Sequence, residues 1–456
     1  MLTAARRPRL AAAGSLLLAL AISALLATPA GPARADTVRS AQMWVLDSVS
    51  APQAWPVTEG QGATVAVIDS GVNPDVSDLA GSVITGPDLT GVHTSPANPN
   101  WGVHGTWMAS LIAGHGHAGG SSGIMGVAPR ARVLSVRVVT DRHDPGYAAY
   151  ERETDNRVQG ALARAISYAV RHRVSVISMS LGYGQPSAVV RSALQAALDH
   201  GIVVVASSGN SGNSVGAQAA GHAPYSFPAD YPGVLGVAAV GRDGSSAGFS
   251  SFNLSVQVAA PGVNVPAQGR DGQYWLVSGT SPACALTAGV AALIKARYPR
   301  LAPALVLRAI TSSAQHRPRG GYDDRVGFGT VDAVAALTAA GQLAGHQRAG
   351  TGTAAAVHFG GGAAAVPPDP VQRRGAGGLI AAILAGLGCL MLAGLAASRL
   401  RALRRVSRSQ GQHAADPRPP RIAWPAPRVP ATAARQEDPG EDPRPGAAPR
   451  WPGSRS

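Results

Sequence analysis

Apolar and polar residues alternate in blocks along the middle of this chain. Runs rich in β-branched and other apolar residues, each with the length of a strand buried on both faces, lie at 64–68, 131–139, 174–179, 202–206 and 234–240. Stretches with helical spacing of apolar residues lie between and after them, at 157–172, 187–200, 282–297 and 303–313. This alternation predicts an α/β fold: a doubly wound, mostly parallel sheet with helices on both faces.

The start of the 456-residue chain differs from its middle in composition. Residues 1–35 combine an arginine-rich start, an apolar run and the small-x-small sequence Ala33-Arg34-Ala35, which predicts a secretory signal peptide. The alternative is an uncleaved membrane anchor. We expect a short N-terminal extension at 36–59 and one main domain at 60–340.

A second apolar stretch, 375–398, contains no charged residue. About 24 residues suffice to cross a bilayer with some tilt. The absence of a polar face argues against the alternative, a buried core helix. We therefore predict a transmembrane helix at 375–398, reached through a Gly/Ala/Pro-rich linker at 341–374.

Arginines follow this apolar stretch at once, at Arg399, Arg401, Arg404, Arg405 and Arg408. Because basic residues stay on the cytoplasmic side, we expect a single-pass protein of the cell membrane. The main domain would be extracellular. The basic, proline-rich tail at 399–456 would be cytoplasmic and disordered.

The formal net charge of +14 is concentrated at the two ends. Residues 1–35 carry four arginines and no acid, and 371–456 carry 14 arginines and five acids, which leaves 21 basic and 20 acidic residues for 36–370. A nucleic-acid-binding domain would carry a basic excess of its own. Nucleic acid is therefore not an expected partner.

The two cysteines, Cys284 and Cys389, lie in different predicted regions and are not expected to meet. No intramolecular disulfide is predicted, although export would permit one. We expect Cys284 to be a buried small apolar residue rather than a nucleophile.

Three short motifs suggest nucleophilic chemistry. Asp69-Ser70-Gly71 ends the first predicted strand, His104-Gly105-Thr106 begins a helical stretch, and Gly279-Thr280-Ser281 precedes Pro282 and an Ala-rich helix. The order Asp, His, Ser is one of the chain orders that build a nucleophilic triad. In it the imidazole takes the serine proton, and the carboxylate fixes the imidazole tautomer.

Each of these residues also has a plainer interpretation. Asp69 could cap the next turn, and Ser281 could be a simple helix N-cap. Asn210 closes a buried strand and could donate to an oxyanion, or it could be a turn residue. The combination favours the chemical interpretation. His115 and His117 lie in a Gly-rich loop without a carboxylate or Cys cluster, so no metal site is assigned.

With these residues, the chain resembles the subtilisin-like serine proteases over about residues 55–340. The motifs around Asp69, His104, Asn210 and Ser281 fit the family pattern, as does Ser178-Met179-Ser180-Leu181-Gly182. The resemblance implies a serine endopeptidase with Asp69, His104 and Ser281 as the triad and Asn210 as the oxyanion donor. It also implies a substrate-binding segment, formed by Ser180, Leu181, Gly182, Ser207, Ser208 and Gly209.

Within that family, the layout is similar to the mycosins, membrane-anchored proteases tied to type VII secretion. This implies protein or peptide substrates and type VII membrane components as partners. Ala285 stands where the family usually has proline, and mycosins commonly carry disulfides. Subtilisins often bind calcium, but no clear oxygen-ligand loop is present, and no cofactor is expected.

Two other functions compete with this interpretation. An α/β-hydrolase esterase would need Gly-x-Ser-x-Gly and the order Ser, Asp, His. A scaffold role, in which the domain stabilises a secretion complex and catalysis is secondary, stays open because the tether would hold the domain beside membrane partners.

Overall fold

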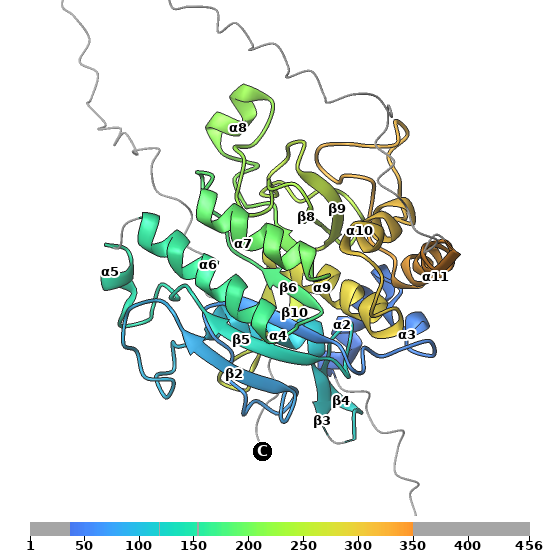
Figure 1. Ribbon diagram of the computed structural model, residues 1–456. Coiled ribbons are helices and arrows are strands. Elements are labelled where there is room, and N and C mark those ends of the chain that lie inside the picture. The colour runs from blue at the N-terminus through green and yellow to red at the C-terminus, as the bar shows by residue number, and fades with distance from the viewer. Residues whose placement is uncertain (1–36, 118, 153–154, 350–456) are drawn as a thin grey trace, which may run out of the picture. The chain divides into compact units, whose positions relative to one another are not determined.

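A seven-stranded sheet forms the centre of the computed structural model, which describes residues 37–117, 119–152 and 155–349. The strand order is β2-β5-β1-β6-β7-β8-β9, and all neighbours pair in parallel (Figure 1). The predicted parallel sheet is confirmed. Its strands are β1 (Thr64–Asp69), β2 (Val83–Asp88), β5 (Arg132–Arg137), β6 (Val176–Met179), β7 (Val203–Ser207), β8 (Val234–Val240) and β9 (Val256–Pro261).

Helices cover both faces of this sheet because strand side chains point alternately to either side. Val65 and Val67 of β1 belong to one hydrophobic cluster, whereas Ala66 and Ile68 belong to the other. The first cluster includes α4 (Val103–Ala113), α9 (Thr280–Arg297) and α10 (Pro303–Ser312), and the second includes α6 (Asp155–Arg171) and α7 (Ala188–Asp199).

Helix α9 is the most enclosed of these helices. Every residue from Thr280 to Lys295 is buried except Ser281. A helix that is apolar on every side is expected in the interior of a domain. The burial therefore leaves one side chain near the start of this helix, Ser281, at the surface.

The predicted extension at 36–59 contributes to the same core. It forms α2 (Thr37–Ser48) and α3 (Ala51–Ala54), and Val45, Leu46 and Val49 are completely buried in the cluster that contains α9. The Arg39 guanidinium donates to the carbonyl oxygens of residues 120, 122 and 123 at 2.9–3.3 Å. Helix α2 is thereby fastened to the hairpin of β3 (His115–His117) and β4 (Ser122–Met125).

Two strands of the sheet were not predicted, and both are edge strands. Strand β2 is only half-buried and contains Gly86 and Pro87, with a register shift between Thr85 and Asp88. Proline is tolerated there because an edge strand does not need every ladder hydrogen bond. Helix α11 (Ala333–Ala349) also continues nine residues past the predicted domain end at 340. The remaining elements are α5 (Tyr147–Tyr150), α8 (Val215–Ala220), β10 (Val265–Gln268) and β11 (Tyr274–Val277).

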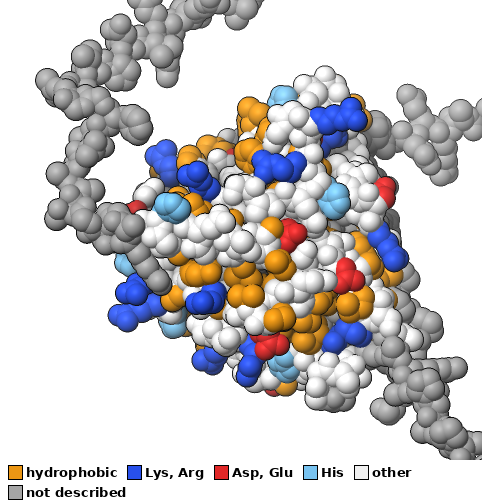
Figure 2. All heavy atoms as spheres, turned by 90° about the vertical axis from the view of Figure 1, so that its right-hand side faces the viewer, with side chains coloured by type: hydrophobic (Ala, Val, Ile, Leu, Met, Phe, Trp, Pro, Cys, Tyr) orange, Lys and Arg blue, Asp and Glu red, His pale blue; other side chains and the backbone are white. Residues whose placement is uncertain are grey.

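The predicted signal peptide, transmembrane helix and cytoplasmic tail lie outside the described residues, as does the linker beyond Ala349. Within residues 37–349 as described, no helix is both long enough and apolar enough to cross a membrane. Figure 2 looks onto the right-hand side of Figure 1, where hydrophobic side chains gather near the middle of the face and charged ones lie around them. Helix α11 packs half-buried apolar side chains against the core, among them Val334, Ala339 and Leu343.

The Arg39 contacts yield a stability prediction. Arg39→Ala should lower the free energy of unfolding by about 2 kcal/mol, because hydrogen bonds to charged groups contribute roughly 1.5–3 kcal/mol. Urea denaturation would measure this. The matched control is Arg130→Ala, which removes an exposed pair with Glu59 at 3.5 Å and should cost less than about 1 kcal/mol. Equal effects of the two substitutions would contradict the anchoring role of Arg39.

Candidate active site

Asp69 is the last residue of β1, at the carboxyl edge of the sheet where open α/β folds place their ligands. Its side chain is almost fully buried, and Oδ1 accepts hydrogen bonds from the Ser70 amide at 2.7 Å and from His104 Nδ1 at 2.8 Å. A buried carboxylate is stable only when it is paired and hydrogen-bonded. His104 and the Ser70 amide meet that need at Oδ1, whereas the buried Oδ2 has no hydrogen-bond partner among the described residues.

His104 reaches Asp69 because two glycines let backbone segments approach closely. A Cβ at Gly105 would lie 2.1 Å from the Gly71 carbonyl oxygen, and one at Gly71 would lie 2.6 Å from the Trp101 ring. Gly71 also has φ of +101°, a conformation that other residues rarely adopt. The first turn of α4 therefore rests directly on the turn that follows β1.

The imidazole of His104 is 30% exposed, and its ring lies edge-on to Trp107 with centroids 6.3 Å apart. Burial lowers the pKa of His104, but attraction to Asp69, the hydrogen bond with Asp69 and attraction to Asp141 together outweigh it and raise the pKa to about 9. The protonated imidazole is thus the favoured form at neutral pH. Since Nδ1 contacts the carboxylate, Nε2 is the nitrogen left for a reaction partner.

Ser281 lies in the first turn of α9 and does not hydrogen-bond to His104. Its Oγ donates to the Ser180 carbonyl at 3.4 Å, and the Ser180 hydroxyl donates back to the Ser281 carbonyl at 3.2 Å. The structure thus brings Asp69 and His104 together and joins Ser281 to the segment after β6. Because β1 and β6 pair in parallel and end at Asp69 and Met179, the contacts of His104 and Ser281 both lie at the carboxyl edge of the sheet.

Asn210 is held beside Ser281 by Thr280. Its Oδ1 accepts from the Thr280 amide at 2.9 Å and from the Thr280 hydroxyl at 3.0 Å. A backbone N–H can only donate, so the amide oxygen must face Thr280 and Nδ2 must face away. A Cβ at Gly279 would lie 3.5 Å from Nδ2 and 3.7 Å from the Ser281 nitrogen, so both nitrogens border the same small space.

The six predicted substrate-binding residues fall into two groups. Ser180, Leu181 and Gly182 follow β6 and are partly or fully exposed. Ser207 and Ser208 are buried, at 4% and 0% exposure, and the Ser208 hydroxyl donates to the Ser251 carbonyl. The Gly209 amide donates to the Thr280 hydroxyl at 3.2 Å, which fastens this loop to α9. The first group is therefore at the surface, whereas the serines of the second lie beneath it.

The loop histidines do not form a metal site with their neighbours. His117 Nδ1 contacts Asp78 at 2.7 Å, whereas His115 contacts the carbonyls of Gly116 and Ala80. Within the described part of the chain, no three His, Cys, Asp or Glu side chains converge on one point. Cys284 is fully buried, as predicted, and burial raises its pKa to about 12, so its thiol is unreactive.

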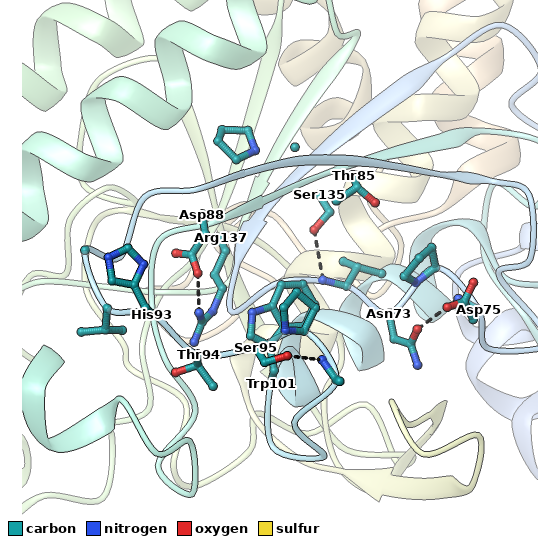
Figure 3. A pocket seen from close by; sticks show the side chains of 18 residues that line it. Asn73, Asp75, Thr85, Asp88, His93, Thr94, Ser95, Trp101, Ser135 and Arg137 are labelled. Atoms are coloured by element: carbon teal, nitrogen blue, oxygen red, sulfur yellow. Dashed lines mark hydrogen bonds and ion pairs between the residues drawn. The ribbon is translucent and has the colours of Figure 1, made fainter.

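Two further residues near the candidate site are not predicted by the sequence. Arg137 is 1% exposed and pairs with both Asp88 and Asp144, and its Nε donates to the Ser70 carbonyl. Figure 3 shows Arg137 with Asp88 in a cavity of about 720 Å³ that does not include His104 or Ser281. The second position is Asp141, whose carboxylate binds the start of α4. Neither has a local sequence signature, because both act on residues distant in the chain.

Comparisons with known proteins identify the family to which the chain belongs. The model of the subtilase family matches residues 60–329. Thermitase from Thermoactinomyces vulgaris is 35% identical over 57% of this chain and 84% of thermitase, and mycosin-1 from Mycobacterium tuberculosis is 34% identical over 65% of this chain and 73% of mycosin-1. The structure of MycP1, described as a serine protease and an essential component of the type VII (ESX-1) secretion system, matches with a TM-score of 0.52 and 33% identity, over 65% of this chain and 88% of that one. The predicted resemblance to subtilisin-like proteases and mycosins is confirmed.

The Asp69–His104 pair makes stability depend on pH. The pKa of His104 rises from 6.5 to about 9 on folding, so its stabilisation is complete below pH 6.5 and is lost as pH rises through 9. Urea denaturation should show the free energy of unfolding falling by about 1–2 kcal/mol across this window. His104→Gln should flatten the decline, whereas His200→Gln, at an exposed position after α7, should preserve it. If the decline persists in His104→Gln, the pH dependence of stability arises from other groups.

Proposed function

Because the chain belongs to the subtilase family of serine endopeptidases, we propose that Asp69, His104 and Ser281 hydrolyse peptide bonds as a catalytic triad. The observation that carries this proposal is the 2.8 Å bond between His104 Nδ1 and the buried Asp69 carboxylate. When the imidazole is neutral, this bond keeps its proton on Nδ1 and leaves Nε2 able to accept one.

In the proposed reaction, His104 Nε2 removes the Ser281 hydroxyl proton while Oγ attacks the peptide carbonyl carbon. The tetrahedral intermediate collapses as the imidazolium gives that proton to the leaving amine, which breaks the C–N bond and leaves an acyl-enzyme. Water, deprotonated by the same imidazole, attacks the ester carbonyl, and Ser281 recovers its proton. Rotation about the Cα–Cβ bond of Ser281 would first release its hydroxyl from the Ser180 carbonyl.

The negative oxygen of the tetrahedral intermediate would be bound by Asn210 Nδ2 and the Ser281 amide. Support comes from the Thr280 contacts, which point Nδ2 away from its anchor, and from the glycine at 279, which keeps the space beside both nitrogens open. Donors fixed before the reaction lower the barrier because they need no reorganisation when charge develops.

The proposed substrate is an extended polypeptide laid along Ser180, Leu181 and Gly182. These residues lie between β6 and the bridge that pairs Tyr183 with Phe227, and they are partly exposed. A peptide could add to this edge by main-chain hydrogen bonds, a common mode of peptide recognition. Ser207, Ser208 and Gly209 would line the first specificity pocket mainly through their backbone.

We infer a membrane-anchored, extracellular setting associated with type VII secretion. The support is the similarity to mycosin-1 and MycP1, together with the signal-like residues 1–35 and the apolar stretch 375–398. A scaffold role is the second candidate, because MycP1 is described as an essential component of its secretion system. Complementation of a deletion strain by Ser281→Ala would favour the scaffold role, and its failure would favour catalysis.

The triad proposal is tested by substituting the nucleophile. Ser281→Ala should reduce hydrolysis of an unfolded protein and labelling by a fluorophosphonate to background, because both reactions need the Ser281 hydroxyl as the nucleophile. Ser278→Ala, at an exposed position three residues earlier, and Cys284→Ala should keep both activities. Unchanged activity in Ser281→Ala would refute the assignment.

The oxyanion role of Asn210 predicts a separate kinetic effect. Asn210→Ala should lower kcat by about 10²–10³-fold with little change in KM, the loss typical of removing one oxyanion donor. Asn210→Asp keeps an oxygen for Thr280 but has no N–H to donate, so it should lose as much. A rise in KM with an unchanged kcat would instead indicate a role in substrate binding.

A further inference from the structure

Helix α4, which carries His104, lacks a cap from its own sequence. The residue before it, Gly102, has no side chain, so the first amides of the helix need an acceptor from elsewhere. Asp141 supplies it: Oδ2 accepts from the Val103 amide at 2.9 Å and Oδ1 from the His104 amide at 3.2 Å. One carboxylate thus binds two successive amides, one of which belongs to His104 itself.

We propose that Asp141 is a positioning residue for His104, which anchors the helical turn that carries the imidazole and keeps a second negative charge beside it. The proposal rests on the proposed role of His104 as the general base. Asp69 binds the ring of His104, whereas Asp141 binds its backbone. Together they would hold both ends of the residue.

Asp141 is itself held in place by the buried ion pairs of Arg137. The Asp144 amide donates to the Asp141 carbonyl at 2.9 Å, and the Asp144 carboxylate contacts Arg137 at 2.8 Å. Arg137 in turn donates to the Ser70 carbonyl at 3.1 Å, directly after Asp69. The loop that contains Asp141 is therefore linked to the end of the strand that contains Asp69. This linkage would keep the positions of the two carboxylates relative to His104 constant.

The groups that face His104 come from three elements. Asp69 belongs to β1 and Asp141 to the loop after β5, whereas Trp107 of α4 presents a neutral ring. Both carboxylates raise the pKa of His104 against the effect of burial. The pKa of Asp141 is raised overall: burial and the negative charge of Asp69 raise it, against the lowering effects of the His104 charge and of hydrogen bonds from Ser70 and the His104 amide. The two carboxylates therefore compete for the one cation.

This arrangement has a consequence for the working pH. Only a neutral imidazole can take the serine proton, so the rate should rise with pH as His104 deprotonates. Removing the Asp141 charge should make deprotonation easier and move this rise toward neutral pH. Asp141 would thus lower the activity at neutral pH, while it positions the base and moves the working range to alkaline pH.

The test uses Asp141→Asn and Asp141→Ser in the full-length chain. Asp141→Asn removes the charge and keeps one oxygen that can accept from one of the two amides, whereas Asp141→Ser removes the charge and shortens the side chain. The midpoint of kcat/KM against pH should fall by about 0.5–1 unit, which gives about a three- to tenfold gain at pH 7 and little change on the alkaline plateau. Asp199→Asn is the matched control. Asp199 is exposed at the end of α7, and α7 leads into the start of β7. Asp199 therefore lies at the opposite edge of the sheet from His104.

A second readout does not depend on catalysis. In protein labelled with ¹³C-histidine, the titration of His104, assigned by its loss in His104→Gln, should shift in the same direction. An unchanged titration midpoint, or an equal loss of kcat/KM at every pH, would overturn the proposal and leave Asp141 a purely structural cap. If the wild-type chain showed no peptidase activity, the proposed function would fail, but the His104 titration would still decide the role of Asp141.

Discussion

The site depends on the close approach between the first turn of α4 and the turn that follows β1. There is no room at this contact for a side chain on Gly105, and Trp101 fills the space beside Gly71. Because the two backbones meet, the imidazole at position 104 lies within hydrogen-bond distance of the carboxylate at position 69. A larger residue at Gly105 would push helix and strand apart, and the pair would separate even if both side chains were retained.

The sequence predicts those parts of the molecule whose physical cause is local. Strands such as β7 and β8 are buried on both faces, so they appear as continuous apolar runs. Such runs also indicate Asp69, which directly follows one, and Asn210, which closes the turn after another. The edge strand β2 is half-exposed and interrupted by Gly86 and Pro87, so it has no such pattern.

Other features depend on residues far apart in the chain, and no local pattern indicates them. Arg137 looks like an ordinary strand residue until β2 and the loop after β5 place Asp88 and Asp144 beside it. Asp141 looks like a loop residue until α4 is found to begin without a cap. Similarly, nothing in the short helical segment at 37–48 indicates that Val45 and Leu46 complete the main core.

Thr280 joins Ser281, the proposed nucleophile, and the proposed oxyanion donors into one unit. This buried side chain accepts from the Gly209 amide and donates to Asn210, so the loop after β7 moves with the start of α9. The rest of α9 is enclosed in the core, which fixes the unit relative to the sheet. The Ser281 hydroxyl can still turn about a single bond, and the imidazole is held by Asp69. In the proposed mechanism the Ser281 hydroxyl leaves the Ser180 carbonyl by a side-chain rotation while the backbone that carries the proposed donors stays in place, and a fixed backbone is what preorganised donors require.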